Sequence, residues 1–168
     1  MTALGEQAAS VSAADFRQAM GHFATGVTVV TSVTADGSPA GTTANAVTSL
    51  SLDPPLVLVC LDLASLTLQA IRQHGAFTVN VLGEPQRELS VNFARRGFAA
   101  AWDGVPHRSG RTGSPRIQGA LAVLDCTVEA QLPGGDHEII VGRVRAAEVT
   151  GDGAPLVYWR GSYASLDR

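Results

Sequence analysis

The sequence predicts a mainly β protein, with a barrel-like core and a few short helices. β-branched and apolar residues form short runs at close spacing, at 27–33, 47–52, 56–61 and 77–82, and two longer runs at 120–132 and 137–149. Turn residues separate these runs, as expected for antiparallel strands. The chain shows no internal repeat and no alternation of strands with long helices, so a parallel sheet of βαβ units is not indicated.

Length and charge further limit the kinds of protein to which the chain can belong. The 168 residues favour one domain. Residues 1–12 lack the basic start and apolar centre of a signal peptide, so we expect a flexible tail there and the domain at 13–168. No apolar run approaches the roughly 18 residues of a membrane helix. The net charge of −3 does not indicate nucleic-acid binding, which requires a positively charged surface.

All twelve basic residues are arginine, and the chain contains no lysine. Schiff-base chemistry on lysine and a P-loop lysine are therefore excluded. The two cysteines, Cys60 and Cys126, lie inside apolar runs and are expected to be buried free thiols. Free thiols and the missing secretion signal favour a cytoplasmic protein.

The first predicted element is a helix over 13–23, ended by Gly26. Ser12 is a favourable N-cap, and Asp15 places negative charge in the first turn. Helical spacing also gives an apolar stripe, which consists of Phe16, Ala19, Met20 and Phe23.

A strand over 27–33 follows, and Asp36-Gly37 signals a hairpin whose partner is 39–44. Strands over 47–52 and 56–61 come next. Ser65 then opens a helix that Gly75 ends. Its expected buried positions are Leu66, Leu68, Ala70 and Ile71.

Residues 77–82 form another predicted strand, and Pro85 begins a further helix. Between 97 and 115 the composition turns to Gly, Arg, Ser and Pro around Trp102, which predicts a long, mobile excursion. The two longer runs then flank a Pro-Gly-Gly-Asp hairpin loop at 133–136. Strands over 156–159 and 162–166 close the chain.

One stretch, Gly41 to Asp62, is rich in short side chains that form hydrogen bonds. Six of them lie within ten residues: Thr42, Thr43, Asn45, Thr48, Ser49 and Ser51. Such a set can line a polar, uncharged ligand with many donors and acceptors, such as the ring and ribityl chain of a flavin. The alternative is a Ser/Thr-rich surface strand followed by a turn at Asp53-Pro54.

Ser65 and Thr67 lie at the start of a predicted helix, where hydroxyl groups and free backbone N–H groups can hold a phosphate. The alternative is simple N-capping by Ser65. Arg95-Arg96, just after Phe93, can balance the phosphate charge or favour the C-terminal end of their own helix.

Two further side chains are candidates for ligand contact. His137 follows the hairpin loop and can orient a nicotinamide or meet charge on a reduced flavin; alternatively it is a surface turn residue. Tyr163 can stack on a ligand or simply pack. Metal-ligand spacing is absent among the four histidines, so no metal site is expected. Neither a GxSxG nor a GxGxxG motif signals a hydrolase or Rossmann site.

Together these segments resemble the flavin reductase family, the small components of two-component flavin-dependent monooxygenases. The similarity covers nearly all of the chain after residue 13. The matching motifs are FATGVTVVT (23–31), GTTANAVTSLSLDPPLVLVCL (41–61), Ser65 with Thr67, FTVNVL (77–82), LSVNFA (89–94), GDH (135–137) and PLVYWRGSY (155–163).

This resemblance implies an FMN-binding split β-barrel, a Greek-key barrel that works as a homodimer with flavin near the subunit interface. The implied flavin contacts are Thr25, Gly26, Val27, Thr28, Thr42, Thr43, Ala44, Asn45, Ala46, Ser49, Ser51, Ser65, Thr67, Phe93 and Arg95, with His137 and Tyr163 on the nicotinamide side. Asn45 would stabilise the reduced ring. For residues 97–115 the resemblance implies no site residue.

The implied reaction is hydride transfer from NADH or NADPH to FMN or FAD, with diffusible reduced flavin delivered to a separate monooxygenase. The absence of lysine and of an arginine cluster for a 2′-phosphate favours NADH. Two alternatives remain: an FMN-binding module without catalysis, and an oxidase on the same fold. The pyridoxine-phosphate oxidases share the fold, but the TANA segment favours the reductases.

Overall fold

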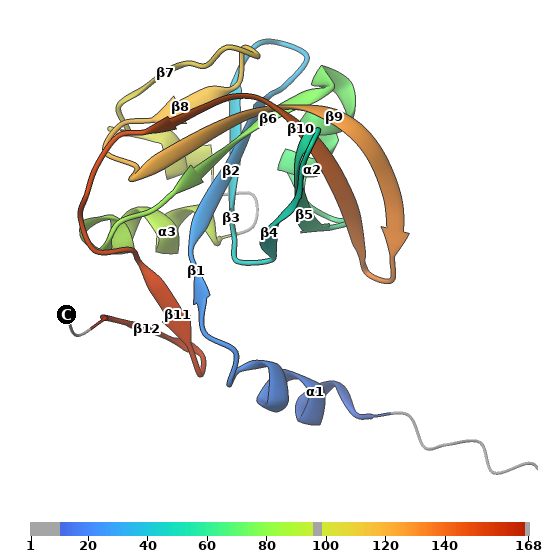
Figure 1. The fold of residues 1–168 in the computed structure, drawn as a ribbon, viewed down its shortest axis with the longest axis vertical. Coiled ribbons are helices and arrows are strands. Elements are labelled where there is room, and N and C mark those ends of the chain that lie inside the picture. Colours follow the sequence, from blue (N-terminus) through green and yellow to red (C-terminus); the bar gives the residue numbers. More distant parts are fainter. Residues whose placement is uncertain (1–10, 96–98, 167–168) are drawn as a thin grey trace, which may run out of the picture.

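The computed structural model describes residues 11–95 and 99–166. A seven-stranded antiparallel sheet curls into a half-open barrel (Figure 1). The strand order is β3 (Pro39–Ala44), β2 (Thr28–Val33), β6 (Ala76–Val81), β9 (Ala122–Gly134), β10 (His137–Val149), β5 (Pro55–Asp62) and β4 (Val47–Leu52). The predicted mainly β fold is confirmed, and the predicted strands match these within a few residues.

Strand alternation gives the barrel two apolar clusters. Val30 points to the inner cluster, where Phe77 and Ile140 are fully buried. Its neighbour Val29 points the other way, into a second cluster with Phe93 of α3 (Arg87–Phe93). Because successive strand side chains face opposite sides, β2 is buried on both faces and organises the whole fold.

Helix α2 (Leu66–His74) packs against the barrel strands β2, β3 and β6. Its limits match the prediction, with Ser65 as the N-cap and Gly75 in the left-handed region at φ 71°. The expected buried face is wrong at one position, because Leu66 is 59% exposed whereas Thr67 is 2% exposed. The barrel therefore covers the helix from a slightly different side than its apolar residues alone indicate.

Helix α1 (Ala13–Met20) begins at Ser12 as predicted, but Gly21 rather than Gly26 ends it. Residues 21–23, predicted as the end of the helix, form a turn instead, and a short strand, β1 (Thr25–Gly26), follows and pairs with β11 (Val157–Trp159). No side chain of α1 is buried, and the helix stands away from the barrel (Figure 1). The apolar stripe therefore finds no partner within the described part of its own chain.

The segment predicted as a mobile excursion is folded over its described residues. It contains a 3-10 turn, η2 (Ala99–Trp102), and a hairpin of β7 (His107–Ser109) with β8 (Pro115–Ile117). The carboxylate of Asp125 on β9 accepts hydrogen bonds from the Arg111 backbone and from Arg116. These buried polar contacts, which composition does not indicate, attach the hairpin to the barrel.

The remaining elements are short. The 3-10 turn η1 (Glu84–Gln86) precedes α3. Strand β11 forms a hairpin with β12 (Ser162–Ala164) beside β1. No helix of the described residues is long and apolar enough to cross a membrane. The predicted tail, residues 1–12, lies outside the described residues except for Val11 and Ser12.

Candidate functional site

A cavity of about 610 Å³ opens between the start of α2, the edge strand β3 and the α3–η2 segment. We call this the first cavity. It brings together five of the residues singled out in the sequence, from three separate segments: Thr42, Ser65, Thr67, Phe93 and Arg95. Asp62, Ala64 and Trp102 also line it. Its volume is typical of a small-molecule or cofactor site.

The N-terminus of α2 forms one wall of the first cavity. Ser65 Oγ accepts a hydrogen bond from Leu68 N at 3.4 Å, so its capping role is confirmed. The same residue lines the cavity, as does the buried Thr67. Capping and cavity lining are therefore combined at one residue, and the unpaired N–H groups of the first turn favour an anion here.

Edge strand β3 supplies the second wall, which includes Ala40, Gly41 and Thr42. Thr42 lines the first cavity, whereas Thr43 Oγ1 donates to the Ser90 carbonyl oxygen at 2.6 Å. Ala44 is buried in the inner apolar cluster. The strand period of two places Thr42 and Ala44 on one face of β3 and Thr43 on the other, and of these three residues Thr42 lines the cavity.

Aromatic rings close the far wall. Phe93 and Trp102 pack edge to face, with ring centroids 4.9 Å apart. Gly41 lies against both rings, and a Cβ atom there would come within 2.7 Å of Phe93 Cε1. Arg95, which is exposed, adds a positive charge on the same side. The cavity therefore offers an apolar wall, hydroxyl groups and a cation together.

His137 lies at the end of β10, opposite Asp62 of β5 in the strand register. Its Nδ1 lies 2.7 Å from Asp136 Oδ1, and this hydrogen bond holds the pKa of the Asp136 carboxyl below its usual value. Because Asp62 lines the first cavity, the strand register brings His137 near its rim. Its proposed contact with nicotinamide stays a prediction.

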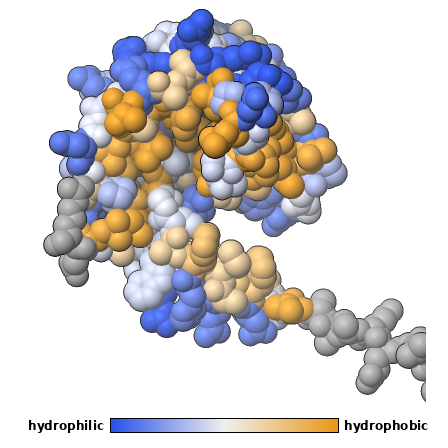
Figure 2. All heavy atoms as spheres, viewed as in Figure 1, coloured by the Kyte–Doolittle hydropathy of each residue, from blue (hydrophilic) through white to orange (hydrophobic). Residues whose placement is uncertain are grey.

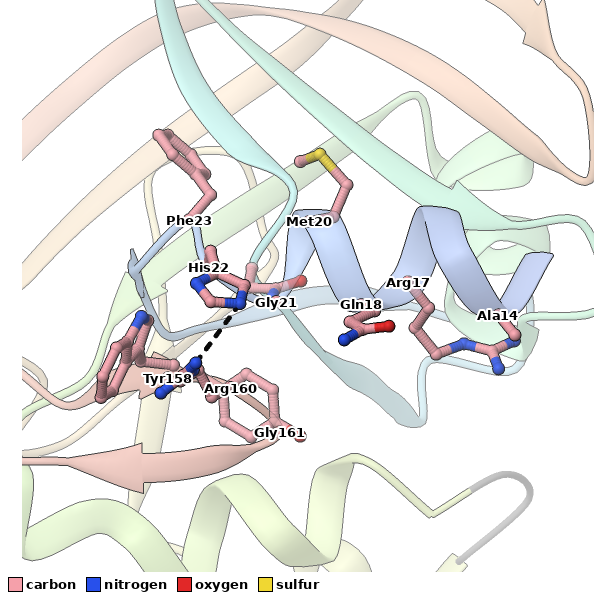
Figure 3. Close-up of a pocket in the computed structure, with 12 residues that line it drawn as sticks. Ala14, Arg17, Gln18, Met20, Gly21, His22, Phe23, Tyr158, Arg160 and Gly161 are labelled. Atoms are coloured by element: carbon pink, nitrogen blue, oxygen red, sulfur yellow. Dashed lines mark hydrogen bonds between the residues drawn. The ribbon is translucent and has the colours of Figure 1, made fainter. Parts of the chain in front are cut away.

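Asn45 borders a different space. A second cavity of about 700 Å³ lies between α1, the β11–β12 hairpin and Asn45 (Figure 3). Ala46 is exposed beside Asn45 at the β3–β4 connection, and Ser49 and Ser51 lie on β4, outside the lining of both cavities. Their proposed flavin contacts stay predictions.

The 25–28 segment is largely enclosed by protein. Val27 is 2% exposed within the second apolar cluster, and Thr28 Oγ1 donates to the Ala44 carbonyl oxygen at 2.7 Å. Gly26 is exposed. Thr25 Oγ1 is buried without a hydrogen-bond partner among the described residues. An unpaired buried hydroxyl is costly, so this group is suited to meet a ligand atom or water.

Tyr163 lies among protein groups. Its hydroxyl lies 2.8 Å from Ser90 Oγ, its ring packs edge to face on Tyr158, and the Arg87 guanidinium lies 5.2 Å from the ring centroid. These contacts match the packing alternative, and a ligand contact for Tyr163 stays a prediction.

The two thiols differ in burial. Cys126 is fully buried, and burial raises the pKa of its thiol to about 12, helped by the nearby Asp125 charge. Cys60 is only partly buried, which corrects the expectation that both thiols lie in the core. Among the described residues, no group of three or more His, Cys, Asp or Glu side chains is arranged to hold a metal.

Comparison with known proteins decides the family. Residues 20–167 match the family described as flavin reductase like domain. The chain belongs to this family. The match spans all the elements that line both cavities, except for part of α1.

Individual relatives agree. The reductase component of a 4-nitrophenol 4-monooxygenase/4-nitrocatechol 2-monooxygenase of Rhodococcus opacus is 47% identical over 150 residues, which cover 89% of this chain and 79% of that protein. A probable flavin reductase of Rhizobium meliloti is also 47% identical, and the chain spans about half (47%) of its length.

Among solved structures, the NADH:FAD oxidoreductase SgcE6 of Streptomyces globisporus, in complex with NAD and FAD fragments, superposes with a TM-score of 0.85. The two chains are 34% identical, and the match covers 92% of each. The fold is therefore that of the split-barrel flavin reductases.

Two cavity residues were not assigned a role from the sequence. Trp102 was noted only as part of the excursion, and Asp62 only as the last residue of the stretch from Gly41 to Asp62. Their positions depend on the packing of η2 against α3 and on the pairing of β5 with β10, which the local sequence pattern does not predict.

Proposed function

We propose that this protein is an NADH-dependent flavin reductase that supplies reduced FMN or FAD to a separate monooxygenase. The observation that carries the proposal is the first cavity, where the helix terminus with Ser65 and Thr67 meets Thr42, Phe93 and Arg95. The names of the relatives, reductase components and an NADH:FAD oxidoreductase, support the same activity.

The residues of the first cavity fit a flavin phosphate and ribityl chain. Ser65, Thr67 and the first-turn N–H groups of α2 would bind the phosphate, and Arg95 would balance its charge. Thr42 would bond the ribityl chain. When bound, the flavin supplies the hydride-accepting chemistry, and the protein supplies orientation. We assign no side chain as an essential acid or base.

The assay follows NADH absorbance in air with purified protein and FMN, FAD or no flavin. We expect rapid oxidation that requires added flavin and saturates with it, and NADPH is compared at equal concentration. Folded protein that oxidises neither nucleotide with either flavin would overturn the proposal. A stably yellow protein that does not oxidise NADH would instead favour the binding-module alternative.

We propose further that the protein is a homodimer formed through the outer face of β5 and β10. Val57 and Val59 point into the core, so Leu58 and Cys60 face outward. In the strand register Val141 pairs with Leu58 and Ile139 with Cys60, which joins these side chains into one apolar patch. Hydrophobic residues also gather on the side of α1 that is turned toward the barrel (Figure 2).

Location in the cytoplasm is part of the same proposal. Both cysteines are free, which is consistent with a reducing compartment.

A further inference from the structure

The β9–β10 hairpin ends in an exposed tip (Figure 1). Residues 131–136 are exposed, and β10 begins directly after them with His137. Backbone hydrogen bonds at an exposed strand end open more easily than those in a core. The hairpin by itself therefore does not fix the position of His137, and contacts from outside the hairpin have to do so.

One such contact joins the tip to the segment that leads into α2. Leu63 N donates to the Asp136 carbonyl oxygen at 3.1 Å, and Asp62 lies opposite His137 in the strand register. Asp62 Oδ1 in turn accepts a hydrogen bond from Ala64 N at 2.8 Å. Asp62 and Ala64 both line the first cavity. The tip is therefore attached to the rim of this cavity, close to the start of α2.

A second contact reaches the other end of the same helix. Arg72, in the last turn of α2, forms an ion pair with Glu138, the residue after His137. Arg72 Nε donates to Glu138 Oε1 at 3.3 Å and Arg72 Nη2 to Oε2, so both carboxylate oxygens are engaged. Gln131 Nε2 on β9 also donates to Glu138 Oε1, at 2.8 Å. The helix and both hairpin strands therefore meet at one carboxylate.

The Glu138 carboxylate is well suited to act as a rigid link. Its side chain is 12% exposed, whereas the Arg72 side chain is 44% exposed. The hydrogen bond from Arg72 outweighs desolvation and lowers the pKa of Glu138 below its usual value, so the carboxyl group is ionised at neutral pH. A two-contact arginine–carboxylate pair restricts orientation as well as distance. The pair therefore limits how the hairpin tip can turn relative to α2.

The two contacts lie far enough apart to fix the angle between the hairpin tip and the helix. Leu63 lies just before α2, and the helix extends about 10 Å from its N-cap to Arg72 at 1.5 Å per residue. One contact alone would let the tip pivot, whereas two prevent it. The helix is anchored to the barrel by its buried side chains, among them Leu68 and Ile71. The hairpin tip, rather than the helix, should therefore move when the ion pair is broken.

We infer that Arg72 and Glu138 are positioning residues, whose ion pair holds His137 in a fixed place relative to the first turn of α2. This inference rests on the proposed function, in which that turn binds the flavin phosphate and His137 contacts the nicotinamide. Hydride transfer requires the donor and acceptor atoms at a close, defined separation. The ion pair thereby fixes the spacing between the two ligands, although neither of its members touches either ligand.

Arg72→Ala is the direct test. It removes both donors and places a good helix former at an exposed helical position, so the fold should be retained. With FMN as acceptor, we expect the KM for NADH to rise about tenfold, with the Kd for FMN unchanged. General destabilisation would weaken both ligands. Arg143→Ala is the matched control, because it breaks a two-contact pair with Glu129 on the same hairpin and leaves α2 untouched.

The same change in a His137→Ala background separates positioning from a direct effect. If Arg72 acts through His137, Arg72→Ala should raise the KM for NADH no further once the imidazole is gone. Equal increases in the two backgrounds would overturn the inference. So would an unchanged KM in Arg72→Ala alone, or an equal rise in Arg143→Ala.

Amide hydrogen exchange tests the link without any ligand. The Leu63 N–H group should exchange about tenfold faster in Arg72→Ala than in the wild type or Arg143→Ala, because its acceptor on Asp136 moves with the tip. Unchanged exchange would overturn the inference. If the wild type does not oxidise NADH but exchange rises in Arg72→Ala, the proposed function fails while the link between α2 and the hairpin stands.

Discussion

Arg116 Nη2 lies 2.7 Å from Asp125 Oδ2, and the Asp125 side chain is completely buried. Thr78 Oγ1 donates to the same carboxylate at 2.9 Å. The pair links β8 to β9 and thereby holds in place the segment of η2 and the β7–β8 hairpin, which lies beside the first cavity. A buried ion pair whose remaining lone pairs are satisfied is costly to break from one side.

Replacing Asp125 by Asn should therefore destabilise the protein. It leaves the buried Arg116 with only the partly exposed Glu148 as an ionic partner. We expect the free energy of unfolding to fall by about 3–5 kcal/mol, measured by urea denaturation. Asp103→Asn, at an exposed position, serves as the control. Equal midpoints for the two variants would show that the pair is not a structural link.

The same carboxylate should govern stability in acid. Burial alone raises the pKa of Asp125, but hydrogen bonds from Arg116, the Arg111 backbone and Thr78 outweigh it and lower the pKa below its usual value. A lowered folded-state pKa contributes stability that is present above the unfolded value of about 3.9 and is lost as the pH falls through the folded value. We expect wild-type stability to fall below about pH 4 and Asp125→Asn to show a shallower fall. Parallel pH profiles would contradict this.

The phosphate-binding role of the α2 terminus can be separated from its capping role. In Ser65→Ala/Thr67→Ala we expect the Kd for FMN to rise at least tenfold, because two hydroxyl groups leave the cavity wall. Loss of the cap alone costs about 1 kcal/mol of stability. Ser12→Ala removes the equivalent cap of α1 and is the control. Flavin fluorescence quenching gives both Kd values, and an unaltered Kd in the double variant would remove the phosphate assignment.

Gly41 should tolerate no side chain. A Cβ atom there would lie 2.7 Å from Phe93 Cε1 and 3.1 Å from Trp102 Cζ2, so the ring wall of the first cavity must shift. We expect Gly41→Ala to lower stability by about 1–3 kcal/mol and to weaken FMN binding. Gly151→Ala, whose Cβ would meet its nearest neighbour at 3.4 Å, provides the comparison. Crystals of Gly41→Ala with unmoved rings would contradict the explanation.

Introducing a charged side chain tests the proposed homodimer face. Val141→Glu places a carboxylate in the apolar patch of β5 and β10, where burial without a partner is unfavourable. We expect light scattering to give about twice the 17.4 kDa chain mass for the wild type and a monomer for this variant. Ala147→Glu, at an exposed position farther along β10, should leave the mass unchanged. A monomeric wild type would refute the interface.

Local sequence patterns were sufficient to predict most strands of the barrel. The β-branched runs, the Asp36-Gly37 turn and the caps at Ser65 and Gly75 depend on neighbouring residues, and the structure has each where the sequence predicts it. The Asp125–Arg116 pair could not be predicted, because it joins strands through buried polar groups. Composition alone therefore indicated a mobile segment where a hairpin is held in place.

The candidate site was predictable only in part, for a similar reason. Strand alternation separates Thr42 from Thr43, but the sequence does not say which of the two faces a cavity. The positive φ of Arg160 likewise depends on the turn between β11 and β12. The residue types alone do not predict this backbone conformation, so the charged lining of the second cavity, which includes Arg160, can be identified only from the fold.

The position of both cavities on one strand has a consequence for how sequences of this kind can diverge. Loops that border the cavities can change in length, since their ends are free to adjust. An insertion within β3 would instead move Asn45 about 3.3 Å farther along the strand and turn every later side chain to the opposite face. The backbone of Pro39–Ala44 thus sets the distance between the two cavities, and this distance should tolerate substitution far better than insertion or deletion.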